Sequence, residues 1–400
     1  MYKDRNEKES KHRVNRPHQH RQQENLSQSN TETVDERTDN NNQRNTITEI
    51  PATMLKMDYL TERKISQAEM ERRYSWLQKA RMSISSTKDR CRIIHEVIVT
   101  CFGNGSIQIR SGETGQLKAT LRGGMETSFP IMSCRFHPIK KNVFYTSGAC
   151  GNIFQCTTDK NEINKFISEP MNEVNAIDLS SDGNYLVAGG KDAAVRIYDS
   201  EIAKPILTYR RIEEDMMHNV TRFHRMRIFA ARFHHIYTNL IITGGWDDTV
   251  RIWDIRVSDG SIRTIKGPHI CGDAIDLRES HILTGSWVVR ESLQIWDLMS
   301  AKLIETIKPR NRPTTLEGEF LYTVQYFDGD PYGDHILASG SGTGAVEVIN
   351  IKEQKVIDSF NVNKPIVALD SNGTTIVYGG MESVLRLEPD VYIFVITRME

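Results

Sequence analysis

The chain has 400 residues, of which 38% are hydrophobic and 26% charged, with six cysteines and a formal net charge of −1 at pH 7. This charge argues against a protein held on nucleic acid by a strong positive field, and six cysteines are too few for a disulfide-built secreted scaffold. No run of 18 apolar residues occurs and the N-terminus has no hydrophobic stretch, so neither a membrane partner nor a secretory signal is expected. The sequence therefore predicts a cytoplasmic and/or nuclear protein.

Residues 1–60 are predicted to form a disordered tail. Only seven apolar residues occur among the first 50, and Asn, Gln, Ser, Thr and charged residues fill most of the remainder. Such a segment buries too little apolar surface to offset the entropy lost on ordering.

Residues 61–87 are predicted to contain a short helix, over 66–82, and a linker. Ser66 and Glu69 make a capping box at the start of the helix. Met70, Tyr74 and Leu77 follow at spacings of 4 and 3 residues, which places them on one helical stripe. Two interpretations stay open: the helix packs on its own domain, or it binds a partner.

From residue 88 onward, short β-rich runs separated by glycine form a visible repeat. Each unit has an apolar strand, a turn, a second strand ending in small residues, and a third strand. The small-residue steps are separated by 46, 42, 55, 41, 55 and 39 residues. A period near 41 residues with two longer units predicts seven units that close into a ring. The steps begin at Cys101, Ser147, Gly189, Gly244, Gly285, Gly340 and Gly379.

Three of the third strands end in an aromatic residue followed by aspartate: Tyr198-Asp199, Trp253-Asp254 and Trp296-Asp297. At this period, these pairs resemble the WD-repeat β-propeller family. The resemblance covers residues 88–400. It implies an all-β, seven-bladed β-propeller in which neighbouring blades cover the faces of each other's sheets.

The two ends of the predicted ring are less regular than the rest. Blade 1 lacks a clear first strand, and Arg92–Ile94 is the segment that matches best. Val391–Thr397 is apolar and β-branched, so we expect it to supply the outer strand of the last blade.

The resemblance implies a buried hydrogen-bond tetrad in blade 4, formed by His224, Thr243, Asp247 and Trp253. A histidine, an aspartate and a hydroxyl are also the parts of a catalytic triad. In the family these residues form a structural chain that makes a blade rigid, so no catalysis is expected from them. Blade 3 matches the pattern only at Asp192, and we expect the other blades to be less rigid or held by packing.

The resemblance also implies a partner-binding face, where the loops between blades meet the loops that precede the third strands. Two insertions, near 210–224 and 308–319, lie in loops of this kind, and loops on a rigid scaffold often carry function. We expect exposed aromatic side chains beside arginine to act as anchors; the alternative is that they pack on the insertions. The residues expected on this face are Asn175, Lys191, Arg227, Phe229, Trp246, Asp273, Trp287 and Tyr322.

Residues 241–256, IITGGWDDTVRIWDIR, resemble the box with which WD-repeat substrate receptors dock on the adaptor of cullin–RING ubiquitin ligases. By this resemblance, Trp253, Asp254 and Arg256 are the docking residues, and the arginine fork suits an acidic patch on the adaptor. Many blades without a docking function also end with a basic residue here, so the motif has low specificity.

Catalytic signatures are absent from the sequence. Gly340–Gly344 is glycine-rich but lacks the lysine and the helix start of a phosphate loop, and no Gly-x-Ser-x-Gly or Cys-x-x-Cys motif occurs. We expect no enzyme activity, no cofactor and no metal. The predicted function is a non-catalytic scaffold that binds proteins or peptides, with a ubiquitin-ligase substrate receptor as the sharper hypothesis. The alternative is a permanent structural subunit of a larger cytoskeletal, ciliary or ribonucleoprotein complex.

Overall fold

The computed structural model describes residues 82–86 (backbone only), 97–124, 129–212, 221–312, 318–381, 384–389 and 391. All of them belong to one unit, Tyr59–Glu400. Every regular element among them is a β-strand, and the strands form seven antiparallel sheets in chain order. The predicted all-β, seven-bladed propeller is therefore confirmed.

Blades 1 to 4 each contain four strands, numbered from the inside of the ring outward. Their bounds are β1 Met82–Ser86, β2 Val97–Phe102, β3 Ile107–Ser111 and β4 Leu117–Arg122; β5 Ile131–Phe136, β6 Val143–Gly148, β7 Asn152–Thr157 and β8 Ile163–Ser168; β9 Val174–Leu179, β10 Tyr185–Gly190, β11 Val195–Asp199 and β12 Pro205–Tyr209; β13 Ile228–Phe233, β14 Leu240–Gly245, β15 Thr249–Asp254 and β16 Arg263–Lys266.

Blades 5 and 6 also have four strands, and three strands of blade 7 lie in the described part of the chain. Their bounds are β17 Ile275–Arg278, β18 His281–Gly285, β19 Leu293–Asp297 and β20 Leu303–Ile307; β21 Leu321–Tyr326, β22 His335–Gly340, β23 Ala345–Asn350 and β24 Lys355–Asn361; β25 Ile366–Asn372, β26 Thr375–Gly380 and β27 Arg386–Glu388.

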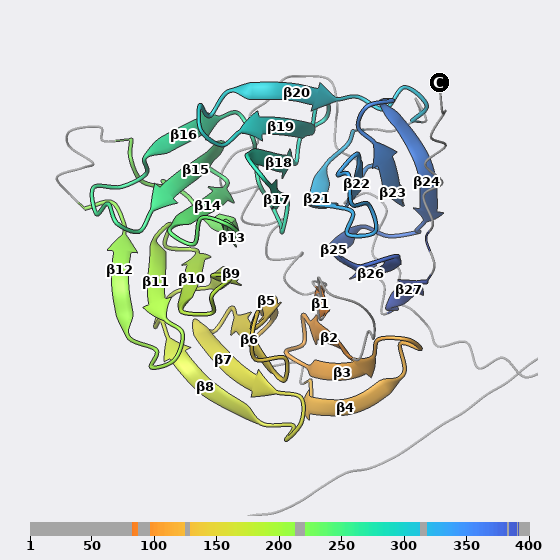
Figure 1. The fold of residues 1–400 in the computed structure, drawn as a ribbon. Helices are drawn as coiled ribbons and strands as arrows, with labels where there is room; N and C mark the ends of the chain where they lie inside the picture. Colours follow the sequence, from red (N-terminus) through yellow and green to blue (C-terminus); the bar gives the residue numbers. More distant parts are fainter. Residues whose placement is uncertain are drawn as a thin grey trace, which may run out of the picture. The chain divides into compact units, whose positions relative to one another are not determined.

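The innermost strands close the ring (Figure 1). Each of β1, β5, β9, β13, β17 and β21 contacts the innermost strand of the next blade, and β25 contacts β1. The outermost strand of each of blades 1 to 6 has at most one buried residue. Strand β14 is buried over five of its six residues, whereas the outer strand β12 is mostly exposed. The continuous apolar runs seen in the sequence are thus strands covered on both faces by neighbouring blades.

The glycine that ends β14 is required by close backbone approach. A Cβ atom built on Gly245 meets the main-chain oxygen of Arg227 at 2.2 Å, a distance that no side chain tolerates. Gly245 therefore lets the loop before the third strand lie against the start of the first strand. The neighbouring Trp246 donates its backbone N–H to the same Arg227 oxygen, at 3.0 Å.

The first blade begins before the predicted boundary at residue 88. Strand β1, Met82–Ser86, pairs with β2 along its whole length, so the sheet starts six residues earlier. The sequence MSISS gave little signal because it has only two apolar residues. Met82 was also predicted to end a helix. Four predictions fall outside the described residues. They are the tail 1–60, the helix 66–82 apart from Met82, the strand Arg92–Ile94, and the strand Val391–Thr397 apart from Val391.

Candidate functional site

In blade 4, the structure brings the four predicted tetrad residues into one chain of hydrogen bonds. The His224 Nδ1 lies 3.0 Å from a carboxylate oxygen of Asp247 and donates to it, and Nε2 lies 2.7 Å from the Thr243 hydroxyl oxygen. The Trp253 indole N–H donates to the same hydroxyl oxygen at 2.7 Å. The side chains of His224, Thr243 and Trp253 are buried. The polar atoms of these side chains form hydrogen bonds with one another, which fits a structural role.

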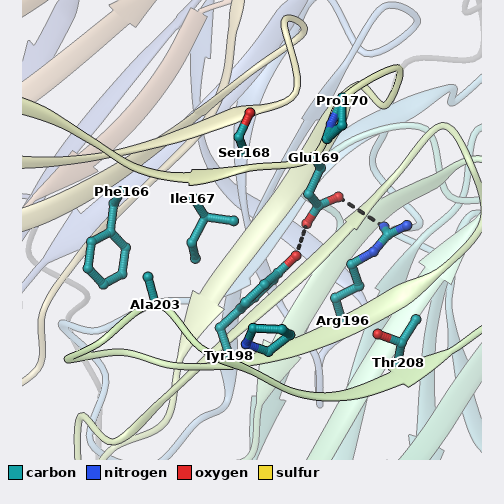
Figure 2. Close-up of a pocket in the computed structure, with 10 residues that line it drawn as sticks. Phe166, Ile167, Ser168, Glu169, Pro170, Arg196, Tyr198, Ala203 and Thr208 are labelled. Carbon is teal, nitrogen blue, oxygen red and sulfur yellow. Dashed lines mark hydrogen bonds and ion pairs between the residues drawn. The ribbon is translucent and has the colours of Figure 1, made fainter.

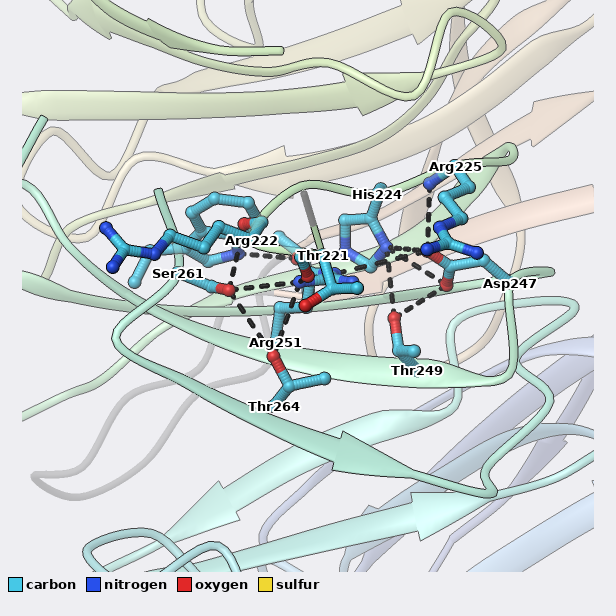
Figure 3. Close-up of polar contacts among 11 residues, drawn as sticks. Thr221, Arg222, His224, Arg225, Asp247, Thr249, Arg251, Ser261 and Thr264 are labelled. Atoms are coloured by element: carbon cyan, nitrogen blue, oxygen red, sulfur yellow. Dashed lines mark hydrogen bonds and ion pairs between the residues drawn. The ribbon is translucent and has the colours of Figure 1, made fainter. Parts of the chain in front are cut away.

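The carboxylate of Asp247 is held by further donors (Figure 3). The Thr249 hydroxyl donates to it at 2.7 Å, and the backbone N–H of Arg225 at 3.0 Å. Burial by itself raises the pKa of this carboxyl group. The charge and hydrogen bond of His224, together with these donors, outweigh burial and hold the pKa of Asp247 well below its ordinary value. Asp247 is therefore a firmly ionised anchor for the loop.

Blade 3 holds a different network at the same place. Ala188 stands where the blade 4 tetrad has a threonine, so the Tyr198 hydroxyl instead donates to the Glu169 carboxylate at 2.8 Å. The Arg196 guanidinium donates to Glu169 at 2.9 Å and also pairs with Asp192. We expected this blade to be less rigid or held by packing; the structure adds an ionic network around the buried Glu169. Sequence analysis missed Glu169 because a carboxylate replaces the imidazole of the motif.

The aromatic side chains expected to be exposed in blade 4 are buried, which corrects that expectation. Trp246 is 5% exposed and Phe229 1%, and their ring centroids lie 5.0 Å apart. The Arg227 guanidinium, also buried, lies 5.8 Å above the Trp246 ring. The three side chains pack on one another and form a floor, so a partner does not reach them directly.

The same correction applies to the other predicted face residues of blades 3 and 6. Tyr322 is 6% exposed and Asn175 is 1% exposed. The Asn175 amide donates to the main-chain oxygen of Ile228 at 3.0 Å, so it joins blades 3 and 4. Trp287 is partly buried, with its ring centroid 4.9 Å from that of Phe320 and 6.4 Å from that of Tyr322. These rings extend the aromatic floor across blades 5 and 6.

Asp273 faces the centre of the ring rather than a partner. It pairs with Arg135 of blade 2 at 2.7 Å and with Arg232 of blade 4 at 3.1 Å. Arg135 also lies 3.5 Å from Asp178 of blade 3. Blades 2 and 5 are three places apart in a ring of seven, so the Arg135–Asp273 pair spans the centre. Together with Asp178 and Arg232, this pair connects blades 2, 3, 4 and 5.

Lys191 is the predicted face residue that is exposed, with 49% of its side chain accessible. Its ammonium group donates to Glu173 at 2.9 Å, and Arg227 donates to the other oxygen of the same carboxylate at 2.7 Å. Lys191 and Trp246 occupy matching places, because each donates its backbone N–H to the residue before the first strand of its blade. One blade thus presents a cation where the next buries an indole.

A comparison with known protein families matches two segments of the chain. Residues 162–199 and 219–254, which lie in the region of blades 3 and 4, match the family model described as "WD domain, G-beta repeat". These are the segments that carry the two networks above. Two segments of the propeller therefore match the WD-repeat family.

The proteins that this chain resembles are distant relatives. Jouberin of Rattus norvegicus is 20% identical over 53% of the chain, and a guanine nucleotide-binding protein subunit beta-like protein of Encephalitozoon cuniculi is 23% identical over 54%. The mitotic checkpoint protein bub-3 of Caenorhabditis elegans is 26% identical over 39%. The alignments span 20%, 65% and 42% of those proteins. The three names describe different tasks, so the likeness points to a shared scaffold.

One polar residue on this side of the propeller, His269, has no signal in the sequence. The His269 Nδ1 lies 2.7 Å from Asp248, and the His269 main-chain oxygen accepts the backbone N–H of Trp287 at 2.8 Å. Burial lowers the pKa of His269, but the neighbouring Cys271 and Asp248 raise it to about 10. An imidazolium–carboxylate pair therefore joins blades 4 and 5. No repeat motif contains this histidine, so the sequence gave no signal for it.

Several exposed side chains surround the buried floor of the propeller. Met171 is 99% exposed and holds a positive φ of 66°, a conformation that costs energy for a residue with a side chain. Asp248 has 65% of its side chain exposed, and Val289 is 44% exposed. We call the loop face the surface formed by residues 169–173, 191–194, 246–248, 269–273 and 287–291. Its exposed side chains include the apolar Met171 and Val289 and the charged Lys191 and Asp248.

The three predicted adaptor-docking residues have unequal access. Trp253 is fully buried and belongs to the tetrad, and Asp254 is 7% exposed. Arg256 has 69% of its side chain exposed, and its guanidinium binds both oxygens of Asp254, at 2.8 and 2.6 Å. Only Arg256 is placed to touch another protein, and an adaptor would compete with Asp254 for it.

Two further findings bear on membranes and metals. Within the described ranges, no helix is long and apolar enough to cross a membrane. In the same ranges, no group of three or more His, Cys, Asp or Glu side chains is arranged to hold a metal ion.

Proposed function

We propose that this protein is a non-catalytic scaffold that binds protein or peptide partners on its loop face. The observation that supports this most directly is the contrast between the buried aromatic floor and the exposed Met171 and Lys191 beside it. An exposed apolar side chain next to a charged one, on a rigid support, is the composition of an interface anchor.

The rigidity of the support follows from the contacts below it. Phe229 and Trp246 pack against each other, Glu173 joins Lys191 to Arg227, and the carboxylate of Asp247 fixes the adjoining turn. A partner therefore meets a support that needs no rearrangement on binding, which favours affinity. The strained backbone at Met171 fits this proposal, because strain concentrates at functional positions.

Affinity capture with full-length tagged protein tests the proposal. The double variant Met171→Asp/Lys191→Glu changes exposed side chains on the loop face. The matched control, Ile304→Asp/Lys302→Glu, makes the same changes on the exposed outer edge of blade 5. We expect partners captured by the wild type to bind the first variant about tenfold more weakly or worse and the control equally. Equal capture by both variants would contradict the proposal.

A finer form of the proposal makes the protein a substrate receptor of a cullin–RING ubiquitin ligase. The exposed Arg256 supports it, and the burial of Trp253 limits the contact to this residue and its surroundings. Full-length protein should capture the purified adaptor, and Arg256→Ala should reduce capture more than Arg256→Lys, because lysine keeps the charge but loses the fork. Failure of the wild type to bind the adaptor contradicts this form and leaves the scaffold proposal intact.

The alternative of a permanently assembled subunit has its own test. In that case, residues before the propeller are the anchor, and their removal should release the protein from its complex. Because β1 starts at Met82, the deletion should end at residue 80; a longer one removes a strand of blade 1. Size-exclusion analysis of cell extracts distinguishes the alternatives, and microscopy of the tagged chain tests the expected location in cytoplasm and/or nucleus.

A further inference from the structure

A pocket of about 410 Å³ lies at the side of the propeller, between blades 2 and 3 (Figure 2). Its walls come from the outer strand β8 of blade 2, the loop that follows it, and strands β11 and β12 of blade 3. Its volume falls within the range of small-ligand sites. Its walls include Phe166, Ser168, Glu169, Arg196, Pro205 and Thr208.

Blade 4 has the same side chains at the corresponding place. In blade 3, Arg196 lies two residues before Tyr198, the aromatic residue of the third strand. In the sheet register, Arg196 stands opposite Thr208 of the outer strand. In blade 4, Arg251 lies two residues before Trp253 and pairs with Thr264. The two arginine–threonine pairs therefore mark equivalent positions on neighbouring blades.

In blade 4, the chain itself covers this place (Figure 3). The Arg251 Nη1 donates to the main-chain oxygen of Thr221 at 2.6 Å, and the Ser261 backbone N–H donates to that of Arg222 at 3.0 Å. Phe223, the next residue, packs against the core between blades 3 and 4. The segment 221–223 thus lies over the blade through its backbone oxygens and one aromatic side chain. It belongs to the insertion that blade 4 has and blade 3 lacks.

We infer that the pocket between blades 2 and 3 binds an extended peptide segment of a partner protein, in the way that residues 221–223 cover blade 4. This inference deepens the proposed scaffold function and rests on it. The partner segment offers main-chain oxygens toward Arg196 and Thr208 and places an aromatic or aliphatic side chain against Phe166 and Pro205.

The electrostatics of the pocket favour such an uncharged contact. Glu169 is already bound by Tyr198, Arg196 and Asn172, so it has little capacity for a cationic ligand. The Arg196 guanidinium has five N–H donors, and its hydrogen bonds to Glu169 and Asp192 use two of them. A main-chain oxygen is the acceptor that Arg251 takes in blade 4.

The surroundings of the pocket add apolar surface for a longer segment. Met171 and Ile202 adjoin the lining residues Pro170 and Ala203 in the chain, and they are 99% and 65% exposed. Met171 also belongs to the loop face. A partner held on the loop face would therefore reach the pocket with an adjacent extended segment.

The test uses the full-length protein and a fluorescent, end-blocked peptide with the sequence of residues 219–224, NVTRFH. Fluorescence polarisation should show saturable binding, and a peptide with Asp in place of its Phe should bind at least about tenfold more weakly. Thr208→Trp and Ser168→Trp fill the pocket from opposite walls and should abolish binding. The matched control is Thr306→Trp, at the equivalent outer-strand position of blade 5, and it should bind the peptide normally.

Two results would overturn the inference: no saturable binding to the wild type up to about 1 mM peptide, or equal binding by Thr208→Trp and the wild type. Benzoylphenylalanine placed at position 202, which is exposed and adjoins the pocket without filling it, identifies the occupant. A photocrosslink to the peptide supports a partner segment, whereas a crosslink to the protein's own chain or to a second copy contradicts it. The scaffold proposal fails separately, only when the Met171→Asp/Lys191→Glu variant keeps its captured partners.

Discussion

Blades 3 and 4 are neighbours with the same topology, yet different chemistry holds them. Both have an aspartate before the third strand, an arginine within it and an aromatic residue near its end. In blade 4 the indole of Trp253 reaches His224 through Thr243. In blade 3 the hydroxyl of Tyr198 reaches the Glu169 carboxylate directly. The polar atom of the aromatic side chain is hydrogen-bonded in both blades, to a threonine hydroxyl in blade 4 and to a carboxylate in blade 3.

The difference teaches that a blade requires satisfied polar groups rather than one particular motif. Buried donors and acceptors cost free energy unless they are paired, whatever the partner is. The two solutions have opposite electrostatic character. Asp247 has a lowered pKa, whereas burial raises the pKa of Glu169 in spite of its pairing with Arg196. The predictions below break each network in turn.

The largest effect is expected from Trp253→Ala in blade 4. The indole is fully buried and stacks on Tyr209 with ring centroids 4.7 Å apart. Its removal leaves a cavity and an unpaired Thr243 oxygen, and we expect the free energy of unfolding to fall by about 4 kcal/mol. Urea denaturation measures this. Trp253→Phe keeps the ring contact and should cost less than half as much; equal losses for both variants would show that cavity formation is not the main cause.

Trp246→Ala should also act on stability, by about 3 kcal/mol. Trp246 is buried against Phe229 and Arg227, so its loss damages the floor of blade 4. Its counterpart in blade 3, Lys191, is exposed, and Lys191→Ala should change stability by less than about 0.5 kcal/mol. Thermal melting of the two variants compares them. A Trp246→Ala protein of normal stability that loses its partners would instead make Trp246 the exposed anchor that the sequence predicts.

Glu169→Gln tests the blade 3 network, with an expected loss of about 2 kcal/mol. The amide keeps the shape of the side chain but loses the charge that Arg196 pairs with. Its NH2 end becomes a donor that faces either the Tyr198 hydroxyl or the donors of Asn172 and Arg196. Arg196 keeps Asp192 as a partner, which limits the loss. Glu201→Gln, at an exposed position of the same blade, is the control. Indistinguishable denaturation curves for the two variants would mean that packing alone holds blade 3.

The sequence predicted the repeating parts of this fold well because they depend on local pattern. Strands β11, β15 and β19 end at Asp199, Asp254 and Asp297, where the aromatic–aspartate pairs indicated. Strand β1 could not be predicted because its residues have no pattern of their own and gain order by pairing with β2. Its place depends on closure of the ring, which is a non-local condition.

The candidate site was harder to predict because burial there is decided by contacts between blades. Trp246 and Trp287 follow glycine or serine in a turn, a position that normally exposes a side chain, yet each packs on a ring from a first strand or its approach. Asp273 is drawn to Arg135, which lies 138 residues away in the chain. Glu169 departs from the motif and left no local signal. None of these contacts can be read from spacing alone.

The smallest expected effect is a difference in pH dependence between the two blades. The pKa of Asp247 is lower in the folded protein than its ordinary 3.8, so its contribution to stability is complete above pH 3.8 and is lost as the pH falls through the folded value. The pKa of Glu169 is raised above its ordinary 4.5, so its contribution is complete below pH 4.5 and is lost as the pH rises through the folded value.

Acidification from neutral pH should therefore weaken blade 4 relative to blade 3, by about 1 kcal/mol. Amide hydrogen exchange followed by mass spectrometry, corrected for intrinsic rates, compares peptides that cover β15 and β11. Asp247→Asn should remove the acid sensitivity of β15, and Glu169→Gln should remove the opposite trend in β11, because each substitution deletes the titrating group. Parallel changes in both strands of the wild type would show that the ring opens as one unit and that the two networks are not energetically separate.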